Sequence, residues 1–221
     1  MTRKSRQPLD FYPTDLDVVR LGFYGLKRRL RELQLSFDPS FMVEPCSGAE
    51  APFAKVALEV FPSLQAVATV EKSCDAIAFP KRHHSREDFF VWARDVQPKH
   101  GFQLACTNPP FSWGEEVARA CCEVILSPDG LGMFLLRLAF LESKTRIPLW
   151  KASSLALLHV NILALRPSFT GDGHTDQKTP YGFYIFCVKG EVEHQRWLAA
   201  GCEKPTLDWL PAELPGSWKE G

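Results

Sequence analysis

The residues best suited to chemistry lie in one short run of the chain. Residues 102–111 read Phe-Gln-Leu-Ala-Cys-Thr-Asn-Pro-Pro-Phe. The apolar part is typical of a buried strand, and the two prolines that follow fix φ and donate no backbone hydrogen bond. Because a residue before proline is disfavoured in the helical region, Asn108 leaves the strand in a stiff, preset turn. In open α/β sheets, ligands bind at this carboxyl end of the strands, near the point where strand order reverses.

Such a turn suits catalysis on an exocyclic amino group, for example adenine N6. The lone pair of that nitrogen is delocalised into the ring, so a catalyst must localise it by accepting hydrogen bonds from both N–H groups. We expect the Asn108 side-chain oxygen and the Pro109 carbonyl to be these acceptors. Phe111 offers an aromatic face on which a flat base could stack. This chemistry needs no metal. The alternative is that Asn-Pro-Pro only ends a strand.

Asn108, Pro109, Pro110 and Phe111 together resemble the catalytic motif of amino-group methyltransferases that depend on S-adenosylmethionine (SAM). The resemblance is strongest to small DNA adenine-N6 methyltransferases of the phage and prophage type. It implies an α/β fold, the Rossmann-like, doubly wound and mostly parallel sheet of the class I SAM-dependent methyltransferases. It also implies SAM as cofactor and adenine in DNA as substrate.

Composition is compatible with this expectation. A chain of 221 residues, 45% hydrophobic and 24% charged, is long enough for one α/β domain. We expect a cytoplasmic protein, because no apolar run approaches the length of a membrane span and the N-terminus lacks a secretory signal. Seven cysteines without a Cys-x-x-Cys pair indicate neither a disulfide framework nor a zinc site.

Charge is balanced, with 26 basic and 26 acidic residues, so attraction to DNA must come from local clusters. Residues 27–31 and 81–86 are basic, and either segment could contact a phosphate backbone or be a solvated surface. We see no separate target-recognition domain. Sequence specificity is therefore expected to be short or to be supplied by a partner subunit.

The first half of the chain predicts the cofactor site. After a flexible basic tail over 1–10, Thr14 is predicted to cap an amphipathic helix that begins at Asp15. Residues 11–14, Phe-Tyr-Pro-Thr, resemble a motif that precedes the first strand in one permutation of the adenine methyltransferases. That resemblance implies that Tyr12 and Thr14 line the methionine moiety of SAM. A plain capped helix is the alternative.

A short strand in 41–48 ends in Glu44 and Pro45, and Gly48 allows a tight turn and close approach of the backbone to a ligand. This resembles the first SAM-binding motif, although Ala49-Glu50 stands where relatives often have a second small residue. A helix over 51–61 and a strand over 66–71 follow. Glu71 lies about twenty residues beyond the turn, the spacing at which Rossmann-type folds place a carboxylate on the ribose.

Asp88 and Phe89 resemble the acidic-Phe element by which relatives hold the adenine ring of SAM; a surface Asp beside a core Phe is equally compatible. The full set of expected cofactor-binding residues is Tyr12, Thr14, Glu44, Pro45, Gly48, Glu71, Asp88, Phe89 and Asn108.

The second half alternates apolar strands with helices, which indicates a doubly wound sheet. We predict a helix over 113–126, a turn over 127–130, strands over 131–141, 159–165 and 181–188, and a helix over 143–152. Residues 11–200 are expected to form a single methyltransferase domain, with a short helix after 191. The tail over 201–221 is expected to be irregular.

Residues 166–180 resemble the Arg-Pro-x-Phe and glycine-rich loop of small phage-type adenine methyltransferases. The resemblance implies that Arg166 and an aromatic residue of the next strand, Phe183 or Tyr184, approach a flipped base together with Phe111. A plain aromatic strand is the alternative. RNA adenine, guanine N2 and protein glutamine amides also remain open as substrates, as does a catalytically silent subunit that binds nucleic acid or a partner.

Overall fold

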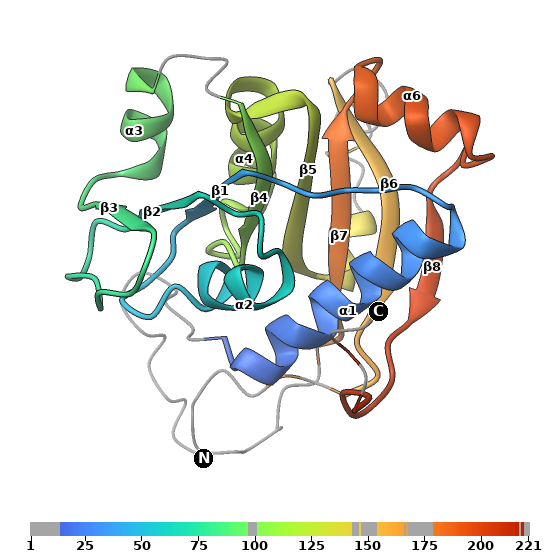
Figure 1. Ribbon diagram of the computed structural model, residues 1–221, viewed down its shortest axis with the longest axis horizontal. Helices are drawn as coiled ribbons and strands as arrows, with labels where there is room; N and C mark the ends of the chain where they lie inside the picture. The colour runs from blue at the N-terminus through green and yellow to red at the C-terminus, as the bar shows by residue number, and fades with distance from the viewer. Residues whose placement is uncertain are drawn as a thin grey trace.

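The computed structural model describes residues 14–96, 101–142, 146, 154–165, 167, 179–216 and 218. Its strands form one sheet in the order β3-β2-β1-β4-β5-β7-β6-β8, and β7 is antiparallel to both of its neighbours (Figure 1). The strands are β1 Phe41–Pro45, β2 Ala66–Val70, β3 Arg82–Ser85, β4 Phe102–Thr107, β5 Leu126–Arg137, β6 Leu155–Ile162, β7 Tyr181–Val188 and β8 Thr206–Trp209. The helices are α1 Leu16–Glu32, α2 Pro52–Val60, α3 Phe89–Asp95, α4 Gly114–Ala120 and α6 Val192–Ala199, with a π-helical turn at Cys121–Ile125 and a 3-10 turn at Leu138–Leu141.

The order of the strands reverses between β1 and β4. The chain moves outward from β1 to β2 and β3, and then returns to place β4 on the opposite side of β1. This is the doubly wound arrangement that the sequence predicts, and that expectation is confirmed. The carboxyl ends of β1 and β4 are therefore the place where a ligand is expected.

Two apolar cores cover the two faces of the sheet, which is why its central strands are apolar throughout. Alternate residues of β7 divide between them. Tyr181 and Phe183 pack in the core beneath α1 and α2, while Tyr184 and Phe186 pack in the core beneath α3 and α4.

Helix α1 lies across the face of β6 and β7 (Figure 1). Its two internal glycines allow this approach: a Cβ at Gly22 would lie 2.7 Å from the Phe183 ring, and one at Gly25 would lie 2.7 Å from the Asn161 amide. The predicted cap was wrong by one residue. The N-cap is Asp15, whose carboxylate accepts from the Asp17 amide at 2.7 Å, so the Thr14 side chain is available for another contact.

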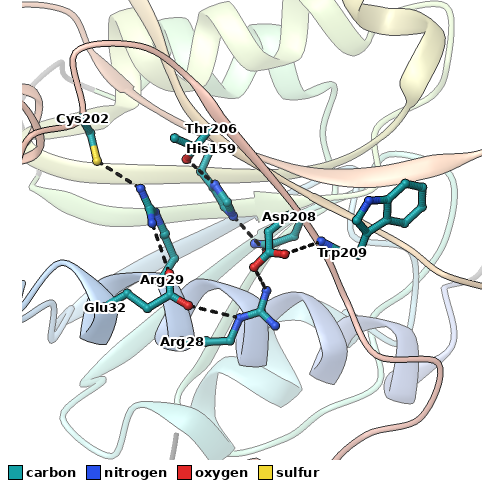
Figure 2. Close-up of polar contacts among 9 residues, drawn as sticks. Arg28, Arg29, Glu32, His159, Cys202, Thr206, Asp208 and Trp209 are labelled. Carbon is teal, nitrogen blue, oxygen red and sulfur yellow. Dashed lines mark hydrogen bonds and ion pairs between the residues drawn. The ribbon is translucent and has the colours of Figure 1, made fainter.

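A polar network fastens α1 to the last strands of the sheet (Figure 2). Arg28 of α1 pairs with Asp208 of β8. Beneath them the His159 ring, which is 2% exposed, bridges Thr206 at 2.7 Å and the Asn161 side-chain oxygen at 3.2 Å. Burial lowers the pKa of His159. The expected irregular tail is thus wrong over 206–209, where the chain adds β8 beside β6.

Other boundaries also differ from the sequence expectation. The predicted turn at 127–130 lies inside β5, where a shift in register between Phe102 and Leu104 of β4 takes up the extra residues. The helix expected over 113–126 divides into α4 and the π-helical turn. The helix expected over 143–152 and the loop over 166–180 lie almost wholly outside the described residues. No helix in the described ranges is long and apolar enough to cross a membrane.

Candidate active site

The two turns singled out in the sequence lie side by side. Val43 of β1 pairs with Ala105 of β4, so the two strands end together at the reversal of strand order. There the buried Thr107 hydroxyl donates a hydrogen bond to the Pro45 carbonyl. This bond joins the end of β1, which leads to Gly48, to the end of β4, which leads to Asn108.

Asn108 is oriented by the residue before α1. Its side-chain nitrogen donates to the Thr14 hydroxyl at 3.0 Å, and Thr14 is buried. Because this bond holds the nitrogen toward α1, it sets the direction of the side-chain oxygen, which is shielded from solvent. Beyond Asn108, the Pro110 carbonyl accepts from the Trp113 amide at 2.9 Å, whereas no described backbone hydrogen bond outside the helices and strands uses the buried Pro109 carbonyl.

Phe111 is half-buried and contacts two other side chains. Its ring centroid is 5.7 Å from that of Tyr181, and the Arg137 guanidinium carbon lies 4.0 Å from the centroid of the Phe111 ring. Arg137 and Tyr181 are directly opposite each other in the ladder of β5 and β7. The three side chains therefore form one cluster at the end of the sheet that carries the Asn-Pro-Pro-Phe turn.

Phe183 and Tyr184 lie elsewhere. Both are completely buried, because β7 is an interior strand with a core on each face. The Phe183 ring packs on Phe53 and on the backbone of Gly22, and the Tyr184 hydroxyl donates to the Arg137 carbonyl at 3.1 Å. Neither ring has surface on which a base could stack, so the geometry gives no support to the prediction for these two residues. The residue of β7 that reaches the turn is Tyr181.

The glycine turn has an unusual backbone. Cys46, Gly48 and Ala51 all have positive φ, at 51°, 59° and 46°. Only glycine adopts this region without cost, so the other two residues hold backbone strain of the kind that gathers at functional sites. Glu71 supports the turn from the end of β2: its carboxylate accepts from the Gly48 amide at 3.2 Å and from the Ser73 amide at 2.9 Å.

Arg82 of β3 holds the other side of this turn. Its guanidinium donates to the carbonyls of Ala49 at 2.8 Å and Ile77 at 2.6 Å, and to the Thr69 hydroxyl at 2.8 Å. Burial lowers the pKa of Arg82. Arg82 belongs to the basic segment 81–86, which the sequence offered as a possible phosphate contact, but its guanidinium supports the glycine turn instead. In the same segment, Arg86 pairs with Asp75 at 2.7 Å.

Glu44 faces the start of α2 rather than open solvent. It is 1% exposed, and its carboxylate accepts from the Ala54 amide at 2.7 Å. Helix α2 begins after Ala51, which offers no side-chain cap, so Glu44 satisfies the helix start from the neighbouring strand. Burial raises the pKa of Glu44 to about 8, although the amides of Phe53 and Ala54 act in the opposite direction.

Asp88 lies beside the end of β2. It caps α3 by accepting from the Phe90 amide at 3.0 Å, and it pairs with Lys72 at 2.8 Å. The Lys72 contact is the main cause that lowers the pKa of Asp88. Phe89 is buried in the core and presents little surface to a ligand.

Five aromatic or basic residues near the two turns were missed by sequence reasoning, and three of them lie close together. Phe90 and Trp113 are exposed, their ring centroids lie 6.0 Å apart, and the Lys72 ammonium lies 5.4 Å from the centroid of Trp113. Each directly follows or lies close to a residue that the sequence had indicated: Lys72 follows Glu71, Phe90 follows Phe89, and Trp113 lies two residues after Phe111. Arg137 and Tyr181 were also missed as site residues. Of the expected site residues, Tyr12 and Arg166 lie outside the described residues.

Comparison with known proteins agrees with the fold. A candidate RNA methyltransferase from Pyrococcus horikoshii superposes with a TM-score of 0.55 at 13% identity, over 84% of this chain and 92% of that chain. A candidate O-methyltransferase from Klebsiella pneumoniae superposes with a TM-score of 0.50 at 12% identity, over 81% of this chain and 84% of that chain. No family model matches the chain, and no curated protein matches it. The sheet is that of the class I methyltransferases.

Proposed function

We propose that this protein transfers a methyl group from SAM to the exocyclic N6 of adenine in DNA. One observation carries the proposal: the Asn-Pro-Pro-Phe turn and the glycine turn lie side by side at the reversal of strand order, joined by the hydrogen bond from Thr107 to Pro45. A turn suited to a planar amino group is thereby placed next to a turn suited to a nucleoside-bearing cofactor.

The residues around the glycine turn fit SAM. Glu71 presents a carboxylate at the end of β2, where ribose hydroxyls need an acceptor, and Gly48 adopts the positive φ that permits close backbone approach. Exposed Phe90 and Trp113 offer apolar faces nearby for an adenine ring. When bound, SAM would supply an electrophilic methyl group.

The chain's own residues would act on the amino group mainly by positioning. In this proposal the Asn108 side-chain oxygen and the Pro109 carbonyl accept hydrogen bonds from N6. Because the Asn108 oxygen is shielded from solvent and Pro109 is buried, the base would have to displace the groups that cover them. The two prolines restrict the backbone of the turn. Thr14 fixes the direction of the Asn108 amide. A target base would have to leave the duplex stack to reach this turn, and Phe111 provides the aromatic surface beside it.

A second candidate is methyl transfer to a protein glutamine amide; an RNA base is open as well. One observation favours a protein substrate over a nucleic acid: most arginines of the two basic segments, 27–31 and 81–86, already have partners within the chain. Arg28 pairs with Asp208, Arg29 with Glu32, Arg86 with Asp75, and Arg82 holds the glycine turn. Because these four arginines have partners within the chain and the net charge is zero, attraction to the phosphate backbone of DNA or RNA rests on few residues.

Incubation with tritiated SAM and DNA, RNA or protein tests the proposal. Asn108→Ala should lower label transfer to adenine about 10²- to 10³-fold, the effect of removing one preorganised electrostatic partner. Gln195→Ala, which removes an exposed side-chain amide on α6, is the matched control and should keep full activity. SAM at one hundred times its dissociation constant should stabilise both variants by about 2.7 kcal/mol. Label that enters only RNA or protein would overturn the DNA assignment, and absence of SAM binding would overturn the enzymatic one.

A further inference from the structure

Arg137 differs from the other residues of its strand. Strand β5 is apolar and buried from Leu131 to Leu136, yet its last residue is an exposed arginine. The Arg137 guanidinium does not extend into solvent. It lies over the ring of Phe111, with its central carbon 4.0 Å from the ring centroid.

No carboxylate balances this charge within the part of the chain that the structure describes. Most arginines in that part, including Arg20, Arg28, Arg86 and Arg196, lie within 4.0 Å of an acidic group. Arg137 has no such neighbour there, a property that it shares with Arg31 and Arg82, and of these three it is the one that contacts Phe111. An exposed arginine without an acidic neighbour among the described residues, beside the Asn-Pro-Pro-Phe turn, is suited to bind an anion from outside the protein.

We propose that Arg137 is the phosphate anchor of the target nucleotide, and that it covers Phe111 until a polynucleotide binds. The inference rests on the proposed function, because the anion in question is a backbone phosphate next to the methylated base. A planar guanidinium matches two phosphate oxygens. Its contact with phosphate is stronger than an exposed contact with an aromatic ring, so the exchange is favourable.

The same step frees the ring that the base needs. Arg137 covers a face of the Phe111 ring, and the Tyr181 ring also contacts Phe111, with the two rings inclined at 42°. When the guanidinium turns to the phosphate, the face that it covered becomes available for stacking. Recognition of the phosphate and admission of the base are then one event. A glutamine amide carries no phosphate, so the arrangement also selects a polynucleotide over a protein substrate.

Salt dependence of binding gives a test without catalysis. Affinity for a labelled DNA duplex is measured by fluorescence anisotropy from low to moderate salt for the wild type, Arg137→Gln and Arg137→Lys. Loss of one phosphate contact should lower the slope of log affinity against log salt by about 0.9 in Arg137→Gln and weaken binding about tenfold at low salt. Arg137→Lys should keep the slope. Arg94→Gln is the control, because the Arg94 side chain is 74% exposed and lies in the last turn of α3.

A chemical substitution in the DNA tests the anchor at the site itself. Once the methylated adenine is mapped, its flanking phosphates are replaced one at a time by neutral methylphosphonates. At one position the wild type should lose about tenfold in kcat/KM, and Arg137→Gln should lose nothing further. Equal methylphosphonate losses in both proteins, or an unchanged salt slope in Arg137→Gln, would overturn the anchor while leaving the proposed function intact. A wild type that methylates no polynucleotide would overturn the proposed function itself.

Discussion

Replacing Glu44 with glutamine should change how the stability of the protein depends on pH. Burial raises the pKa of this carboxyl to about 8 from an ordinary value of 4.5. The folded protein therefore holds a proton on Glu44 over a range in which the unfolded chain has released it. Glutamine has nearly the same shape, is neutral throughout, and keeps an oxygen that can accept from the Ala54 amide.

The sign and size follow from proton linkage. Because the folded pKa lies above the unfolded one, the contribution of Glu44 to stability is complete below pH 4.5 and is lost as the pH rises through 8. Between these limits the wild type should lose about 1.4 kcal/mol of unfolding free energy per pH unit relative to Glu44→Gln. Over two pH units this is about 2.7 kcal/mol, or roughly 5–10 °C in Tm for a domain of this size.

Urea unfolding of both proteins at several pH values between 5 and 8 measures the difference. Other groups with shifted pKa, such as His159 and Glu193, are present in both proteins and cancel. Parallel stability profiles would refute the reasoning. They would mean that the carboxylate stays ionised in the folded state, and that the two backbone amides at the start of α2 outweigh its burial.

Three further substitutions test the supports of the site. Thr14→Val removes the hydroxyl that accepts from Asn108 and should lower kcat for methyl transfer about 2- to 10-fold, the effect of one neutral hydrogen bond; Thr14→Ser should not, and equal rates would contradict the orienting role. Arg82→Lys loses the planar fork that holds the glycine turn and should lower the unfolding free energy by about 1–2 kcal/mol and weaken SAM binding; unchanged calorimetric affinity would show that the turn needs no such support. Gly22→Ala places a methyl group 2.7 Å from the Phe183 ring and should destabilise by about 1–3 kcal/mol in urea; a more stable variant would disprove the close contact of α1.

Local pattern predicted most of the sheet. The apolar runs that became β1, β2, β4 and β7 are short, buried on both faces and bounded by Pro, Gly or acidic residues, so each could be placed from sequence alone. Strand β8 could not be placed in this way. Its residues alternate between partly buried and exposed, and its position is set by pairing with β6 and by the ion pair from Arg28 to Asp208, both of which join residues far apart in the chain.

The candidate site was predictable in its motifs and not in its contacts. The sequence placed Asn108, Gly48 and Glu71 at strand ends, and parallel pairing brings those ends together. The sequence could not show that α1 would pack on the Phe183 ring at Gly22, or that the Arg137 guanidinium would lie over the Phe111 ring. Such contacts depend on which face of a strand a neighbour covers, and tertiary packing decides that.

The buried hydroxyl of Thr107 links the two turns, because its hydrogen bond holds the end of β1 to the end of β4. A ligand that stiffens either turn lowers the entropic cost of ordering the other. Cooperativity should therefore run in both directions: an adenine-bearing oligonucleotide would tighten SAM by the same factor as SAM tightens the oligonucleotide. Titrations of each ligand with and without the other measure that factor, and Thr107→Val should bring it close to one.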